Sequence, residues 1–140
     1  MLKYAFLFVA VGLLLGADEA KKDSGAEELK NLQGAWTALT FGANGEKVPE
    51  EDAKKIKLTI KDNKWVLERG EGTNQGTIKL DPSKNPKQFD AALDEGDSVP
   101  GIYELKDGTL TMCWTNPGGE RPTSFKNEEG KTVATYKKAK

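Results

Sequence analysis

The sequence predicts an all-β fold, an antiparallel up-and-down β-barrel of about eight strands preceded by a short helix. Two observations predict the strands: apolar and polar residues alternate in short runs after residue 36, and tight turn signals rich in Gly, Asn and Asp separate those runs. A third predicts closure. Gly34 lets the backbone turn sharply just before Trp36, so a large aromatic ring stands at the start of the first strand and can plug one end of a barrel.

The first 17 residues have the pattern of a secretory signal peptide. Lys3 supplies a basic start, residues 4–15 are apolar apart from one glycine, and Gly16 and Ala17 are the small residues expected near a cleavage site. The apolar run is shorter than the about 20 residues that a membrane helix needs. We therefore expect an exported protein, in the periplasm, the cell envelope or outside the cell, with no stable membrane span after cleavage. An uncleaved N-terminal anchor is the alternative.

Composition excludes several classes of function. The chain has 21 basic and 22 acidic residues, and removal of residues 1–17, which carry one lysine and no acid, changes the formal charge from −1 to −2. A net charge this small, and negative in sign, produces no electrostatic field that would attract nucleic acid or an anionic membrane. There is no histidine, which excludes Ser-His-Asp and Cys-His nucleophile pairs and histidine-ligated zinc. Cys113 is the only cysteine, so no intramolecular disulfide forms, and we expect an inert thiol.

Residues 18–25 are charged and lack large apolar side chains, so they are interpreted as a linker before a single domain at residues 26–140. Ser24 can cap a short helix, with Glu27 completing a capping box. Leu29 and Leu32 give this helix one apolar edge. The helix is expected to end at Gly34 and to cover one end of the barrel.

The first half of the domain alternates in the way that strands require. In residues 36–41, Trp36 shares a predicted face with Ala38 and Thr40, and residues 37, 39 and 41 share the other. Residues 48–55 are expected to be a loop with one helical turn. In residues 56–61 the even positions are apolar and the odd positions polar, which indicates a half-buried antiparallel strand. Asp62-Asn63 then predicts a two-residue hairpin into a strand with Trp65 and Leu67.

The second half continues this pattern. Strands are predicted at residues 76–80, 89–93, 102–105, 109–115, 122–126 and 132–137. Residues 81–86 contain two prolines and are expected to be a turn. Lys106-Asp107-Gly108 is a strong hairpin signal.

Six segments, taken in order, resemble a known family. They are residues 32–36 (LQGAW), 45–49 (GEKVP), 81–87 (DPSKNPK), 101–105 (GIYEL), 110–113 (LTMC) and 120–125 (ERPTSF). Together they are similar to the lipocalin-like family of unknown function that is abundant in planctomycete bacteria, over nearly all of residues 29–137. The resemblance implies a calycin-type barrel behind an export signal, with no established activity and no catalytic residues to carry over. It also implies that Gly34 and Trp36 form the barrel base, with Arg121 as the nearest candidate for a late arginine stacked on that tryptophan.

Four residues are candidates for ligand binding. Trp65, Tyr103 and Trp114 either line a pocket, since a barrel of about eight strands can hold one small ligand, or simply fill the interior. Arg121 either anchors an anionic ligand or stacks on Trp36. No cofactor is predicted, and no metal either, because the acidic residues 94–97 lack the spacing of a calcium loop.

Three functions remain open at this point. The first is a non-catalytic binder of a small apolar or amphipathic ligand. The second is an interaction or inhibitor domain with a filled barrel, whose loops at residues 42–55 and 81–100 contact an envelope or extracellular protein. An enzyme would have to use carboxylates such as Glu68, Asp90 or Glu104 without histidine, and the sequence predicts that the protein is not an enzyme.

Overall fold

The computed structural model describes residues 25–70, 72–94 and 96–139. The predicted signal peptide and the linker up to Ser24 lie outside these ranges. Residues 25–31 are helical, so Gly25, assigned above to the linker, already belongs to the helix. No helix in the described ranges is long and apolar enough to cross a membrane.

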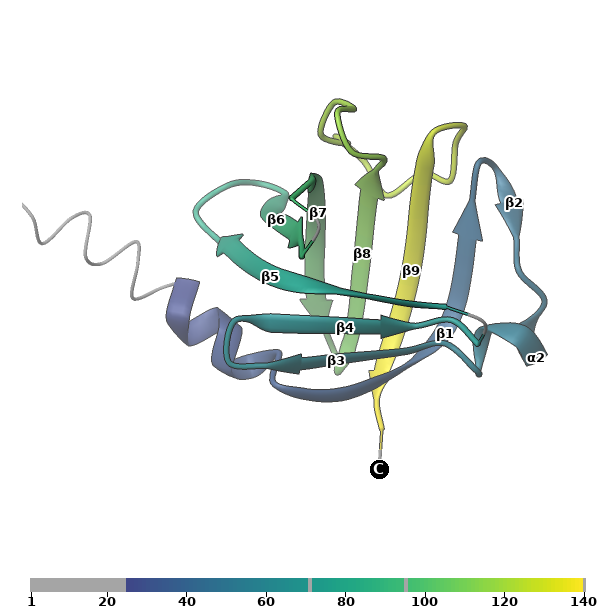
Figure 1. Cartoon of the computed structure of the whole chain (residues 1–140), viewed down its shortest axis with the longest axis horizontal. Coiled ribbons are helices and arrows are strands. Elements are labelled where there is room, and N and C mark those ends of the chain that lie inside the picture. Colours follow the sequence, from purple (N-terminus) through teal and green to yellow (C-terminus); the bar gives the residue numbers. More distant parts are fainter. Residues whose placement is uncertain (1–24, 71, 95, 140) are drawn as a thin grey trace, which may run out of the picture.

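The rest of the fold is a single antiparallel sheet of nine strands with one helical turn (Figure 1). The elements are β1 (Gly34–Ala43), β2 (Glu46–Lys47), α2 (Glu50–Ala53), β3 (Lys57–Lys61), β4 (Lys64–Glu68), β5 (Thr73–Asp81), β6 (Lys87–Leu93), β7 (Ser98–Lys106), β8 (Thr109–Thr115) and β9 (Lys131–Lys138). From β3 to β9 each strand pairs with the next along the chain, as in an up-and-down barrel. In Figure 1, β3 and β4 run across the direction of β8 and β9.

The sheet closes because β1 pairs on both sides. Trp36 lies opposite Leu58 of β3 and also opposite Lys138 of β9. The β1–β9 ladder continues to Ala43 and Thr132. Eight strands therefore form a closed barrel, which confirms the predicted fold class, and two-residue β2 adds only a short hairpin at the end of β1.

The predicted faces of β1 are right up to Ala38 and wrong after it. The register with β9 shifts between Ala38 and Thr40, and such a bulge moves the following side chains to the opposite face. Phe41 is consequently buried in the core, whereas Leu39 is 42% exposed. No residue type in this stretch marks the bulge.

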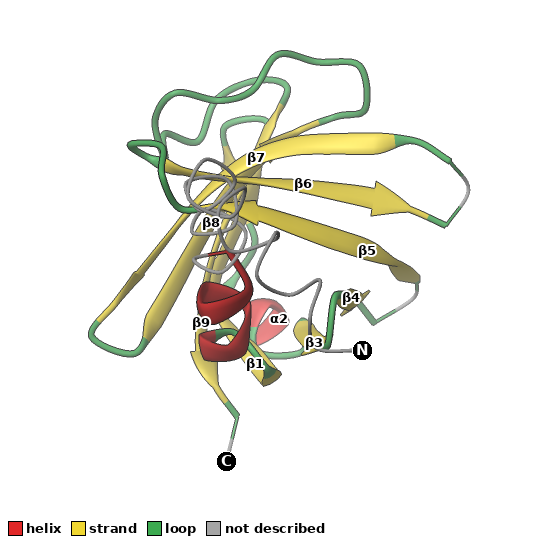
Figure 2. Cartoon of the chain, turned by 90° about the vertical axis from the view of Figure 1, so that its left-hand side faces the viewer, coloured by secondary structure: helices red, strands yellow, loops and turns green. Residues whose placement is uncertain are grey.

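The helix at residues 25–31 covers one end of the barrel, here called the helix end (Figure 2). Leu32, just after the helix, is fully buried, and its carbonyl accepts a 2.9 Å hydrogen bond from the indole Nε1 of Trp36. The Gln33 amide donates to the Asp62 carbonyl and accepts from the Asp62 backbone N–H. These contacts confirm the predicted position of the helix and fix it to β1 and to the β3–β4 turn.

Both predicted two-residue hairpins are present. Asp62 and Asp107 adopt positive φ angles of 56° and 52°, as tight turns between antiparallel strands require. The helical turn expected in residues 48–55 is α2. The strand predicted at residues 122–126 is absent, because the chain after β8 is irregular up to β9.

Residues 116–130 run over the outside of the barrel rather than joining the sheet. Ile102 and Cys113 are opposite each other in the β7–β8 ladder and are 1% and 0% exposed, although they do not belong to the main core cluster. Pro122 is also buried. Arg121 explains the irregular path, since its guanidinium donates to the carbonyls of β6 and β7 and so binds the segment across the outer face.

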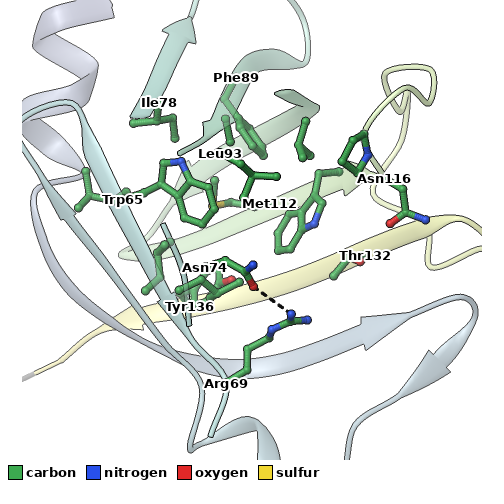
Figure 3. Close-up of a pocket in the computed structure, with 17 residues that line it drawn as sticks. Trp65, Arg69, Asn74, Ile78, Phe89, Leu93, Met112, Asn116, Thr132 and Tyr136 are labelled. Carbon is green, nitrogen blue, oxygen red and sulfur yellow. Dashed lines mark hydrogen bonds between the residues drawn. The ribbon is translucent and has the colours of Figure 1, made fainter. Parts of the chain in front are cut away.

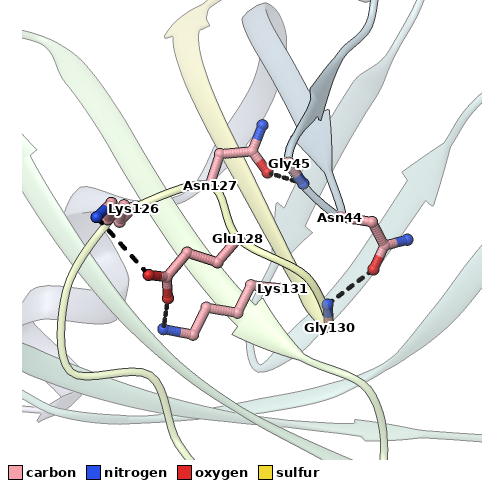
Figure 4. Close-up of polar contacts among 7 residues, drawn as sticks. All are labelled: Asn44, Gly45, Lys126, Asn127, Glu128, Gly130 and Lys131. Atoms are coloured by element: carbon pink, nitrogen blue, oxygen red, sulfur yellow. Dashed lines mark hydrogen bonds and ion pairs between the residues drawn. The ribbon is translucent and has the colours of Figure 1, made fainter.

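Two asparagines join this outer segment to the β1–β2 hairpin (Figure 4). Asn127 Oδ1 accepts a hydrogen bond from the Gly45 N–H, and Asn44 Oδ1 accepts one from the Gly130 N–H. Nearby, Glu128 pairs with Lys131 at 2.8 Å. These two asparagine hydrogen bonds join segments at the end of the barrel opposite the helix, where β4, β6 and β8 end and β9 begins. We call it the open end.

Candidate functional site

A cavity of about 230 Å³ extends from the open end into the barrel (Figure 3). Most of its wall is aliphatic or aromatic. The lining residues are Leu58, Ile60, Trp65, Leu67, Arg69, Asn74, Ile78, Phe89, Ala91, Leu93, Val99, Met112, Trp114, Asn116, Pro117, Thr132 and Tyr136. An apolar cavity of about 150 Å³ can already hold a benzene ring, so this space suits a small organic molecule.

Three aromatic residues, Trp65, Phe89 and Trp114, form part of the cavity wall. Trp65 Nε1 donates to the Thr77 carbonyl at 3.0 Å, which satisfies its only polar group and leaves an apolar ring surface at the cavity. The rings of Phe89 and Trp114 pack edge to face with centroids 6.5 Å apart. Gly101 makes this possible, because a Cβ there would lie 2.2 Å from the Phe89 ring. The aromatic wall therefore depends on a glycine in β7.

The polar groups of the cavity lie mainly in one place. Arg69 Nη2 donates to Asn74 Oδ1 at 3.0 Å (Figure 3). Tyr136 is 1% exposed and lines the same cavity, and its hydroxyl has no hydrogen-bond partner among the described residues. Burial raises the pKa of Tyr136, and the positive charge of Arg69 acts in the opposite direction. Tyr136 is therefore a neutral hydroxyl that can donate or accept a hydrogen bond.

Two of the four predicted ligand-binding residues line the cavity, Trp65 and Trp114. Tyr103 does not. It faces the interior as expected, but it lies nearer the helix end, where its hydroxyl donates to Glu28 Oε1 at 3.1 Å. Lys87 donates to the same carboxylate oxygen. Tyr103 therefore connects the barrel to the helix. Its position along β7 places it nearer the helix end than Phe89, and so outside the cavity.

Arg121 neither lines the cavity nor stacks on Trp36. Its guanidinium donates to the carbonyls of Phe89 and Gly101 and pairs with Asp90 at 2.7 Å on the outer face. The cation over the Trp36 ring is Lys138, with Nζ 5.2 Å from the ring centroid. Gly34 and Trp36 lie at the helix end, but the expected stacking of Arg121 on Trp36 is absent, because β9 brings Lys138 to that ring instead.

The carboxylates considered for catalysis are spread over three strands. Glu68, Asp90 and Glu104 are all exposed, and none lines the cavity. Asp90 is paired with Arg121. Within the described ranges, no group of three or more potential metal ligands comes together.

The Cys113 thiol is expected to react with a disulfide reagent such as 5,5′-dithiobis(2-nitrobenzoic acid) at least about a hundredfold more slowly in native protein than in urea. Cys113 is fully buried, and burial raises the pKa of its thiol, so access and thiolate population are both low. Release of one thiol equivalent in urea is the control. Equal rates in the two conditions would contradict the buried position.

Comparison of the chain with models of protein families, with curated proteins and with solved structures found no match. The family resemblance of the six sequence segments therefore stays a prediction, and any function has to be argued from the cavity itself.

Proposed function

We propose that the protein is an exported, non-catalytic binder of a small apolar or amphipathic molecule, held in the cavity of the barrel. One observation carries the proposal: the barrel interior contains about 230 Å³ of space with an apolar wall and a few polar groups. Ligand sites in proteins have this character, although typical ones for drug-sized molecules are larger, about 300 to 1,000 Å³. The volume favours a ligand with a chain of about eight carbons or a single ring.

The structure offers less support for the interaction domain with a filled barrel. That alternative needs an interior without a ligand cavity and a surface built from residues 42–55 and 81–100. The first group lies at the open end, whereas residues 81–86 precede β6 at the helix end, where Lys87 binds Glu28. Residues 81–86 therefore lie at the opposite end of the barrel from residues 42–55 and do not share one surface with them.

Replacing Ala91 with phenylalanine is expected to weaken binding of 1-octanol by about tenfold or more, because the added ring occupies the cavity that Ala91 lines. The measurement is intrinsic fluorescence during titration, since Trp65 and Trp114 both line the cavity. Wild-type protein should give a saturable change.

Ala92→Phe is the matched control, because the neighbouring residue of β6 is not among those lining the cavity. Its affinity for 1-octanol should stay within about twofold of wild type. Circular dichroism during thermal unfolding checks that both variants are folded. A wild-type protein without a saturable response, or a folded Ala91→Phe variant that binds normally, would overturn the proposed site.

A further inference from the structure

We infer that the cavity selects ligands with an anionic head group, a carboxylate in the simplest case, through Arg69, Asn74 and Tyr136. This inference rests on the proposed function and adds the chemical class of the ligand. Among the seventeen lining residues Arg69 is the only charged one. A single cation at the wall of an otherwise apolar cavity distinguishes an acid from the alcohol or hydrocarbon of the same length.

Arg69 lines the cavity from its exposed rim, since the residue itself is exposed to solvent. It follows β4 in the same alternation that points Trp65 and Leu67 inward, and its backbone N–H donates to the Gly72 carbonyl at 2.9 Å. Its Nη2 donates to Asn74 Oδ1, which fixes one edge of the guanidinium. A guanidinium has five N–H donors, so the others are available to a ligand.

The charge of Arg69 is not neutralised by a protein carboxylate in the part of the chain that the structure describes. The five ion pairs found there involve other cations: Lys55, Lys87, Arg121, Lys126 and Lys131. Glu68, next to Arg69 in the sequence, has the opposite strand parity and is exposed on the outer face. A ligand carboxylate would therefore meet an uncompensated cation.

Tyr136 provides the second, independent observation. The Tyr136 hydroxyl has no protein partner among the described residues and is not one of the fully buried unpaired polar atoms, so it faces the open space of the cavity. Tyr136 and Arg69 line the same cavity, and Figure 3 shows Tyr136 close to Asn74, the hydrogen-bond partner of Arg69. A carboxylate bound to Arg69 would be the acceptor for this hydroxyl, so one ligand group would satisfy both residues.

The geometry also gives the ligand a direction. Arg69 and Asn74 come from the open-end termini of β4 and β5, whereas Ile60 and Ile78 lie nearer the helix end of the barrel. The head group would stay near the opening, where water still reaches it, and the apolar chain would enter the barrel. An ion placed this way avoids most of the cost of burying a charge.

The test compares octanoate with 1-octanol, which have the same chain and differ in head group. Intrinsic fluorescence titrations on the full-length protein should give tighter binding of octanoate than of 1-octanol. In Arg69→Gln, octanoate affinity should fall by about ten- to a hundredfold, because a charge-assisted contact is lost, while 1-octanol affinity stays within about twofold. Tyr136→Phe keeps the ring and should weaken octanoate by about five- to tenfold.

Lys64→Gln is the matched control, since it removes a cation from the outer face of the same strand and should leave both affinities unchanged. Retained 1-octanol binding by Arg69→Gln shows that its cavity is intact. Equal wild-type affinities for the two probes, or an unchanged octanoate affinity in Arg69→Gln, would overturn the anionic preference alone. Absence of binding for both probes would instead overturn the proposed function from which this inference starts.

Discussion

Replacing Trp36 with alanine is expected to lower the free energy of unfolding by about 3 to 5 kcal/mol, the range for removing a large aromatic side chain from a core. Trp36 is 1% exposed, and its Nε1 satisfies the Leu32 carbonyl at the end of the helix. It also lies in β1, which pairs with both β3 and β9. Since domains of this kind are stable by only about 5 to 15 kcal/mol, the variant would be marginally folded.

Urea denaturation monitored by circular dichroism measures this loss of stability. Circular dichroism is used because its signal does not depend on the fluorescence of the replaced tryptophan. Trp36→Phe should fall between wild type and Trp36→Ala, because it keeps most of the ring but loses the N–H donor. Leu39→Ala, on the exposed side of the same strand, should change stability by no more than about 0.5 kcal/mol. A Trp36→Ala variant as stable as Leu39→Ala would show that the base of the barrel does not depend on the indole.

Replacing Gly76 with alanine is expected to destabilise the protein by about 3 kcal/mol, at the upper end of the usual range for overpacking. A Cβ at Gly76 would lie 1.7 Å from the Ala92 carbonyl oxygen and 2.7 Å from its carbon. Both atoms belong to the backbone of β6, so a rotamer change cannot relieve the clash, and the β5–β6 ladder would have to separate near Leu93.

Gly72→Ala is the control for this variant. A Cβ at Gly72 would have no neighbour within 4 Å, and its φ lies outside the left-handed region. Thermal unfolding should therefore show a clear loss for Gly76→Ala and little change for Gly72→Ala. Equal melting temperatures would contradict the close approach of β5 and β6.

Much of the fold could be predicted because its signals are local. The alternation in residues 56–61 and the Asp62-Asn63 and Asp107-Gly108 turns each specify a hairpin without reference to distant residues. The errors come from distant contacts. The bulge after Ala38 arises from the pairing of β1 with β9, and the irregular path of residues 122–126 depends on Arg121 reaching across to β6 and β7.

Part of the candidate site could also be predicted from local signals, and the rest depends on distant contacts. Trp65 and Trp114 line the cavity as predicted, because inward parity and aromatic character suffice to find them. The position of Tyr103 along the barrel axis depends on the stagger of the strands, which the sequence does not display. Arg69 and Tyr136 were missed as candidates, although the alternation from Trp65 through Leu67 to Arg69, and from Ala134 to Tyr136, places each of them on the cavity side, Arg69 at its exposed rim.

Closure of the barrel has a consequence for the order of folding. Trp36 and Lys138 are ladder partners separated by almost the whole folded domain, and so are Phe41 and Ala134. During synthesis, β1 must wait for its second neighbour until β9 has left the ribosome, so an incomplete chain exposes an unpaired sheet edge. Such long sequence separations also slow the conformational search, and refolding on the millisecond-to-second scale is expected, as in other proteins dominated by non-local β pairing.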